Sequence, residues 1–152
     1  MAAVIDIHTH MYTPAWLDLL KETGQPQYEV RESLDSPNTL FRNGASFGPL
    51  EDKHFDFDLR IRNMKDARVD LAIITLSAPS AFWGDEATSL KAATIANDDF
   101  AAAQTQYSDH VRWMATLPWE YPEAAVAELD RACGMGALGV MVLGNINDRH
   151  LT

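Results

Sequence analysis

Two histidines near the amino terminus have the residue type and the spacing of metal ligands. His8 and His10 end a short apolar stretch, residues 4–10, whose pattern is typical of a buried strand. Residues i and i+2 of a strand point to the same face, so the two imidazoles can converge on one point. Imidazole nitrogens bind zinc and similar divalent ions. We predict that His8 and His10 are two ligands of such an ion, zinc being the first choice, against the alternative of a chance pair at an exposed strand end.

The sequence that follows contains the elements that would hold this strand in place. Strands are expected where the chain is continuously apolar, and helices where apolar residues recur at helical spacing behind capping residues. The expected strands are residues 4–10, 71–76, 111–117 and 137–143, and the expected helices are residues 14–23, 56–67, 88–107 and 122–133. Thr13 is expected to cap the first helix, and either Asp56 or Asp58 the second. In the third helix, core positions are expected at Ala93, Ala96, Phe100, Ala103 and Tyr107. The order is a run of βαβ units, which predicts an α/β fold with four parallel strands.

The segment from Gln25 to Lys53 interrupts this alternation. No hydrophobic period holds there, and proline, glycine, asparagine and serine recur. Long excursions of this kind in compact domains are usually functional or mobile. We expect an irregular segment, flanked by two helices that form a hairpin-like insertion after the first strand.

Composition narrows the class of protein. The 152 residues are enough for one domain, 1–152, and 47% of them are hydrophobic. The net charge of −10 argues against a nucleic-acid partner and against an anionic membrane. Cys133 is the only cysteine, and no apolar run is long enough for a membrane span or a signal peptide. We therefore expect a cytoplasmic protein.

The motifs taken together resemble one family. The chain is similar to the amidohydrolase-2 family, in its aminocarboxymuconate-semialdehyde decarboxylase-like branch. Six segments that cover nearly the whole chain carry the resemblance: Asp6 to His10, Asp58 to Met64, Leu76 to Pro79, Asn97 to Ala101, Thr116 to Pro118 and Gly139 to Asn145.

The resemblance implies a metal-dependent enzyme on a (β/α)8 TIM-type barrel of about twice this length. The chain would then be the N-terminal half of that barrel, four parallel strands with their helices, ending in the loop after strand four. It would lack the family's third histidine ligand, a further histidine and a late aspartate. His54, His110 and His150 do not stand at matching positions, so the catalytic residues stay unknown.

Four other residues are candidates for substrate contact. Phe82 and Trp83 follow the second predicted strand of the sheet, and Trp119 follows the third. Loops after strands form the active-site face of such barrels, so these aromatics are expected either to wall a pocket or to pack against a partner subunit. The resemblance also suggests Arg42 as the arginine that grips a substrate carboxylate, a role that suits a planar guanidinium.

Three functions remain open at this point. The first is decarboxylation of a small carboxylated acid, with a metal that stabilises developing negative charge. The second is metal-dependent hydrolysis of an amide or a lactone on the same scaffold. The third is an inactive fragment or half-barrel that must assemble, because four strands cannot close a barrel and leave open edges. A homo-oligomer and a small-molecule carboxylic acid substrate are the expected partners.

Overall fold

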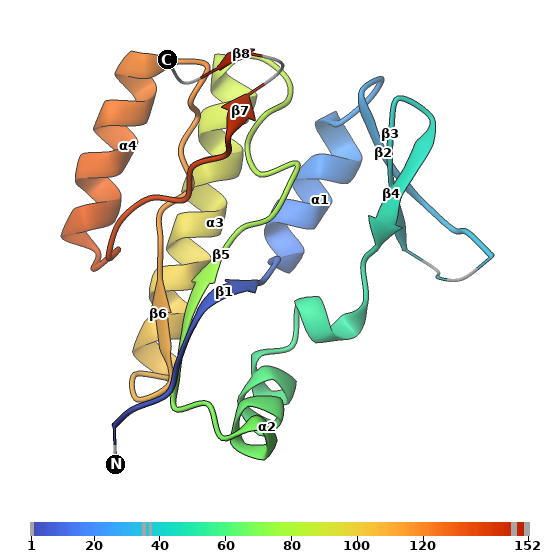
Figure 1. Cartoon of the computed structure of the whole chain (residues 1–152). Coiled ribbons are helices and arrows are strands. Elements are labelled where there is room, and N and C mark those ends of the chain that lie inside the picture. Colours follow the sequence, from blue (N-terminus) through green and yellow to red (C-terminus); the bar gives the residue numbers. More distant parts are fainter. Residues whose placement is uncertain (1, 35, 37, 147–148, 151–152) are drawn as a thin grey trace.

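The computed structural model describes residues 2–34, 36, 38–146 and 149–150 of the chain. Figure 1 shows its elements. The helices are α1 (Pro14–Thr23), the 3-10 helix η1 (Asp52–His54), α2 (Phe57–Ala67), α3 (Glu86–Gln106) and α4 (Pro122–Gly134). The strands are β1 (Ile5–His10), β2 (Tyr28–Arg31), β3 (Thr39–Arg42), β4 (Ala45–Pro49), β5 (Leu71–Thr75), β6 (Val111–Trp113), β7 (Asn145–Ile146) and β8 (Arg149–His150).

A parallel sheet forms the centre of the molecule. Its strand order is β1-β5-β6, and both pairs are parallel. The helix α3 lies behind this sheet, between α1 and α4 (Figure 1). The predicted α/β fold with a parallel sheet is therefore confirmed.

The fourth predicted strand, residues 137–143, is an extended segment and not a regular strand. It lies parallel to the end of β6 and joins it through a single bridge, Ala115 to Val140. Three backbone hydrogen bonds hold the two segments together: Leu138 N to Trp113 O at 3.0 Å, Ala115 N to Gly139 O at 2.8 Å and Met141 N to Ala115 O at 3.1 Å. The pairing follows the prediction, whereas a count of four regular strands is not confirmed.

The described residues of the segment from Gln25 to Lys53 contain regular strands, so the prediction of an irregular excursion was wrong. These strands form a three-stranded antiparallel sheet, β2-β3-β4, which lies beside α1 in Figure 1. Asn43 and Gly44 connect β3 to β4 with positive φ angles of 51° and 81°. Asn-Gly is the preferred dipeptide of a tight hairpin turn that needs two positive φ angles. The turn signal was present, but strands of four or five residues are too short to show a clear period.

In three of the four α-helices of the described chain, the side chain of the residue just before the helix caps its amino-terminal end. Thr13 Oγ1 accepts from Trp16 N in α1, while Asp56 and Asp85 carboxylates accept from the third residue of α2 and α3. Each cap pairs a backbone N–H that the helix itself leaves free. The predicted start of α1 at Pro14, behind Thr13, is confirmed, and Asp56 rather than Asp58 caps α2.

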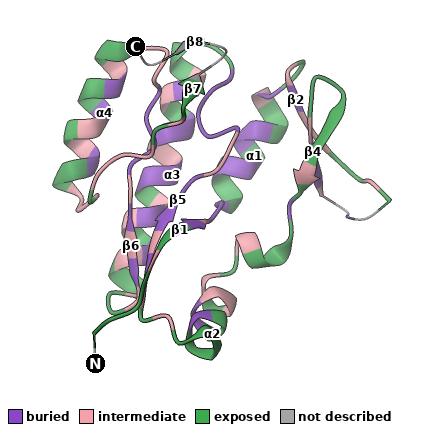
Figure 2. Cartoon of the chain, viewed as in Figure 1, coloured by how far each residue is buried: buried purple, intermediate pink, exposed green. Residues whose placement is uncertain are grey.

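The core lies between the sheet and the helices. Of the five residues predicted to pack in the core from α3, Ala93, Ala96, Phe100 and Ala103 are buried, whereas Tyr107 is half-buried. Figure 2 shows the buried stretch along this helix. Phe100 contacts Trp113 of β6, with ring centres 6.5 Å apart. Small alanine side chains let the helix backbone approach its neighbours, and a large buried side chain contributes about 1.5–3 kcal/mol.

A polar network is buried within this core. Asn97 of α3 is fully buried and pairs with both backbone groups of Thr116, its Nδ2 donating to the carbonyl at 2.9 Å and its Oδ1 accepting from the N–H at 2.8 Å. Asn97 Nδ2 also donates to Glu128 of α4 at 2.6 Å. Arg131 donates two hydrogen bonds to the Glu128 carboxylate, which raises the pKa of Arg131. The network ties α3 and α4 to the chain just after β6.

The end of α2 offers a test of backbone strain. Arg68, its C-cap, is exposed and has a φ of 57°. A side chain in this left-handed region costs about 1–2 kcal/mol, which glycine avoids. Part of this gain is offset by the greater freedom of glycine in the unfolded chain. We expect Arg68→Gly to raise the free energy of unfolding by about 0.5–1 kcal/mol in urea denaturation.

A matched control lies in the same helix. Arg62 is exposed and helical, so Arg62→Gly is expected to lower the free energy of unfolding by about 1 kcal/mol. Equal destabilisation by both substitutions would show that the conformation of Arg68 is not strained.

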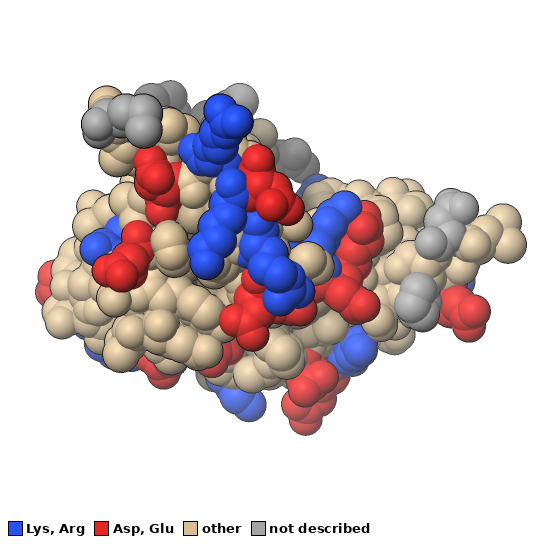
Figure 3. Space-filling view, turned by 90° about the horizontal axis from the view of Figure 1, so that it is seen from below, with Lys and Arg blue, Asp and Glu red and all other residues tan. Residues whose placement is uncertain are grey.

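The surface carries both signs of charge. Figure 3 shows basic and acidic side chains beside one another on the face of the molecule seen from below. Within the residues that the structure describes, no helix combines the length and apolar composition of a membrane span.

Candidate metal centre

His8 and His10 lie together at the carboxyl end of β1. Their ring centres are 5.1 Å apart, and the ring planes meet at 74°. Both rings line a cavity of about 400 Å³ at the ends of β1 and β5. The rest of its lining is mainly apolar: Ile7, Thr75, Ser77, Ala78, Met114, Val140, Met141, Val142 and Leu143.

A bulge in β1 directs the histidines to this cavity. Asp6 pairs with Ala72 of β5, but Thr9 pairs with Ile74, so β1 contains one extra residue between these pairs. Thr9 therefore shares the helix-covered face with Ile74, and both are buried. His10, the next residue, pairs with Thr75 on the opposite face.

Thr75 fixes the ring of His10. His10 Nδ1 lies 2.8 Å from Thr75 Oγ1, and that hydroxyl donates to the carbonyl of Thr9 at 3.4 Å. Because the hydroxyl proton is used in this way, Nδ1–H is the donor to Oγ1, and Nε2 keeps its free lone pair. Burial, together with the charge of neighbouring His8, lowers the pKa of His10. At pH 7 the ring is therefore neutral, as a metal ligand must be.

The pair has the spacing of two ligands of one ion. Two imidazoles on a tetrahedral zinc have ring centres about 5 Å apart when each Zn–N bond is about 2.0–2.1 Å. His8 is exposed, and its backbone N–H donates to the Asp6 carboxylate at 3.1 Å. Among the described residues, no group of three or more histidine, cysteine, aspartate or glutamate side chains is placed to hold a metal. The donor set fits half of a catalytic metal site.

The aromatic residues predicted to wall the pocket lie elsewhere. Phe82 and Trp83 are buried in the core, and Trp83 Nε1 donates to Thr23 Oγ1 at 3.0 Å. The reason is that the loop after β5 folds back on α1, where Trp16 Nε1 donates to Ser80 O at 2.7 Å. Neither aromatic lines the cavity of the histidines.

The two remaining candidates are also outside this cavity. Trp119 is half-buried and packs against the core. Arg42 is exposed at the end of β3, where it pairs with Tyr28 of β2. Within the described residues, the structure brings His8 and His10 together and does not bring any of the four predicted substrate contacts to them.

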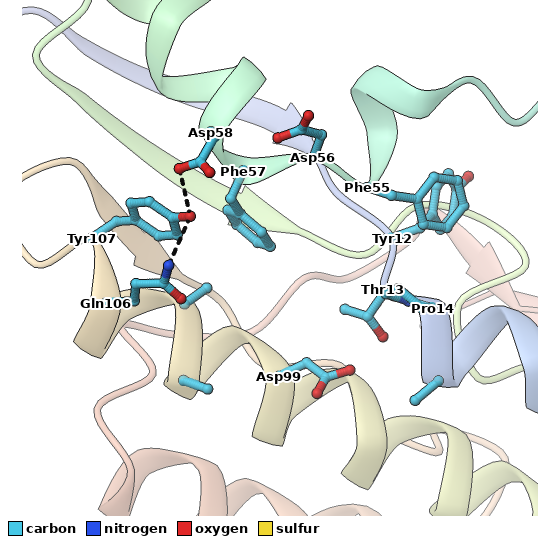
Figure 4. A pocket seen from close by; sticks show the side chains of 13 residues that line it. Tyr12, Thr13, Pro14, Phe55, Asp56, Phe57, Asp58, Asp99, Gln106 and Tyr107 are labelled. Carbon is cyan, nitrogen blue, oxygen red and sulfur yellow. Dashed lines mark hydrogen bonds between the residues drawn. The ribbon is translucent and has the colours of Figure 1, made fainter.

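A larger groove of about 500 Å³ lies between the starts of α1 and α2 and the last turns of α3. Figure 4 shows its carboxylates, Asp56, Asp58 and Asp99, and the bond from Tyr107 to Asp58. Three carboxylates in one groove repel an anionic substrate. The groove therefore does not suit a carboxylic acid, and the histidine cavity is the candidate site.

Sequence reasoning missed Thr75 as a functional residue. It is the single polar residue of the apolar run 71–76. That isolated hydroxyl was the available signal, because a lone polar residue in a buried strand needs a hydrogen-bond partner.

No family model matches the chain. The chain is 25% identical over 153 residues to 2-amino-3-carboxymuconate-6-semialdehyde decarboxylase of Dictyostelium discoideum, covering 97% of this chain and 42% of that protein. It is 28% identical over 128 residues to gamma-resorcylate decarboxylase of Rhodococcus jostii (strain RHA1), covering 79% of this chain and 39% of that protein. The chain thus spans about two fifths of these curated relatives.

Solved structures show the same fold. A crystal structure of an amidohydrolase II is 27% identical, with a TM-score of 0.70 over 98% of this chain and 43% of that one. A dihydroxybenzoic acid decarboxylase from Polaromonas sp. JS666, solved with bound manganese and an inhibitor, is 24% identical, with a TM-score of 0.69 over 93% of this chain and 38% of that one. The resemblance to the amidohydrolase-2 family is confirmed, over a part of each relative.

Proposed function

We propose, from its resemblance to the N-terminal part of amidohydrolase-2 decarboxylases, that this chain carries part of the active site of a metal-dependent decarboxylase. The observation that supports this function is the pair His8 and His10, which line one cavity with ring centres 5.1 Å apart. Both curated relatives described above are decarboxylases of small acids. The proposed substrate class is therefore a small carboxylic acid of aromatic type or origin.

The residues of the cavity have separate roles in this proposal. His8 and His10 hold a divalent ion, and Thr75 keeps the Nε2 lone pair of His10 free for it. When bound, such an ion supplies Lewis-acid stabilisation of negative charge that develops as a carboxylate is lost. The apolar side chains of Met114, Val140 and Val142 suit the ring of an aromatic acid.

Zinc is the proposed ion, because two neutral imidazoles suit it. Manganese is the competing choice, since the related dihydroxybenzoic acid decarboxylase was solved with that ion. Catalytic zinc sites usually have three protein ligands. We infer that the remaining ligand and the acid–base groups come from outside the described residues, and that the 152-residue chain alone binds metal weakly and does not turn over.

The released product tests the reaction type. A protein that carries this chain and the further segments that complete its relatives is expected to release one CO2 for each gamma-resorcylate or related acid consumed. The physical reason is that a divalent ion held by His8 and His10 would supply Lewis-acid stabilisation of the negative charge that loss of a carboxylate leaves on the substrate. Coupled CO2 detection together with product mass measures this. Consumption of an amide or lactone without CO2 would instead identify a hydrolase.

A further inference from the structure

We propose that Arg60 is a positioning residue for the metal ligand His10. The inference rests on the proposed function, because it assigns Arg60 a part in building the same site. As one of two arginines on a surface helix, Arg60 would be expected from the sequence to be a surface charge or an ion-pair partner. Its contacts in the folded chain are of another kind.

Arg60 reaches from the first turns of α2 to the end of β1. Its Nη2 donates to the backbone carbonyl of His10 at 3.1 Å. The side chain is half-buried, and its Nε is buried without a hydrogen-bond partner among the described residues. None of the ion pairs of the described residues includes Arg60. A partly buried guanidinium without a carboxylate partner is unfavourable on its own, so the bond to His10 is its main polar contact.

This bond is one of several hydrogen bonds that hold the backbone in place at the end of β1. Met11 N donates to Thr75 O at 3.1 Å, and Tyr12 N donates to His54 O at 2.8 Å. Those two bonds join backbone groups, so no substitution removes them without moving the chain. The bond from Arg60 is made by a side chain and can be removed alone.

His10 is therefore held at two points. Thr75 Oγ1 accepts from the ring Nδ1, and Arg60 Nη2 donates to the carbonyl of the same residue. The first bond holds the ring and the second holds the backbone from which the ring projects, so a shift of the backbone at His10 would displace Nε2. Outer partners that orient a metal ligand change metal affinity by about 10- to 100-fold when they are lost.

Because Arg60 is charged, its positioning effect on metal affinity can be distinguished from its electrostatic effect. A cation near the site opposes the binding of another cation. Removal of the charge alone would therefore strengthen metal binding. Loss of the hydrogen bond to the His10 carbonyl would weaken it, so the two explanations predict opposite signs.

The test compares metal affinity in four variants of the full 152-residue chain, three at Arg60 and Arg62 and a fourth, His8→Ala. Co²⁺ is the probe, followed by its visible absorption and by equilibrium titration. Arg60→Met is expected to raise the Co²⁺ dissociation constant about tenfold and to alter the Co²⁺ spectrum. Arg60→Lys, which keeps the charge and one donor, is expected to fall between Arg60→Met and the unaltered chain. Arg62→Met removes the same charge from an exposed position of the same helix and is expected to change the constant less than twofold.

Each outcome has a separate meaning. If His8→Ala leaves Co²⁺ binding by the unaltered chain intact, the proposed metal site fails, whatever Arg60 does. If His8→Ala abolishes binding but Arg60→Met binds Co²⁺ as tightly as the unaltered chain or more tightly, only the role of Arg60 is overturned. If circular dichroism shows that Arg60→Met does not fold, Arg60→Lys decides, and unchanged affinity and spectrum in that variant overturn the proposal.

Discussion

Replacement of either His8 or His10 by alanine is expected to lower the affinity of the chain for Zn²⁺ or Co²⁺ by at least about 100-fold. Each substitution removes one of only two candidate ligands in the described part of the chain, and a single imidazole cannot hold a divalent ion firmly. Isothermal titration and metal analysis after dialysis measure this effect. In a longer protein that turns over, activity is expected to disappear together with the metal.

Folding should be nearly unaffected by these two substitutions. His8 is exposed and His10 is half-buried, so the free energy of unfolding is expected to change by less than about 1 kcal/mol. His110→Ala is the matched control, because the His110 ring lies beside the carbonyl of Asp70 before β5 and not at the site. Metal binding that survives in both His8→Ala and His10→Ala, but not in His110→Ala, would place the site elsewhere.

The second large effect is expected at Asn97. Asn97→Ala should lower the free energy of unfolding by about 3–5 kcal/mol, since each buried polar group left without a partner costs about 1–3 kcal/mol and several groups are affected. Here the Glu128 carboxylate, which is 3% exposed, and both backbone groups of Thr116 would lose a partner. Whole domains are stable by only about 5–15 kcal/mol, so this variant would be close to unfolding at 37 °C. Urea denaturation followed by circular dichroism measures the change.

Asn63→Ala is the control for this experiment. Asn63 is an exposed residue of α2, and its replacement is expected to change the free energy of unfolding by no more than about 0.5 kcal/mol. Equal and small effects of both substitutions would mean that water or relaxed neighbours replace the bonds of Asn97.

Regular alternation made much of the fold predictable from the sequence. The runs at residues 71–76 and 111–117 correspond to β5 and β6. The capping signal at Thr13 marks the start of α1, and α2 starts at Asp56, the first of its two candidate caps. The sheet β2-β3-β4 was missed because its strands are short and half exposed, which leaves no hydrophobic period to read.

The candidate site was predictable only as far as neighbouring residues determine it. The spacing of His8 and His10 within one strand was enough to bring them to one cavity. The partners of His10 lie 65 and 50 residues further along the chain, at Thr75 and Arg60. In the sequence, aromatic residues after β5 look the same whether they line a pocket or pack in the core. The hydrogen bond from Trp16 to Ser80 holds this loop against α1, so Phe82 and Trp83 lie in the core.

The register of β1 with β5, which includes one extra residue in β1, makes the metal site sensitive to the length of β1 and not only to its amino-acid composition. Thr9 pairs with Ile74 and His10 with Thr75, so deletion of Thr9 alone would place His10 opposite Ile74, on the face that the helices cover. The imidazole would then be turned toward the helices with every ligand residue still encoded. Loss of one residue at this point of β1 should therefore be far less tolerated in evolution than a conservative replacement of Ile5 or Ile7. Both of these side chains are substantially exposed.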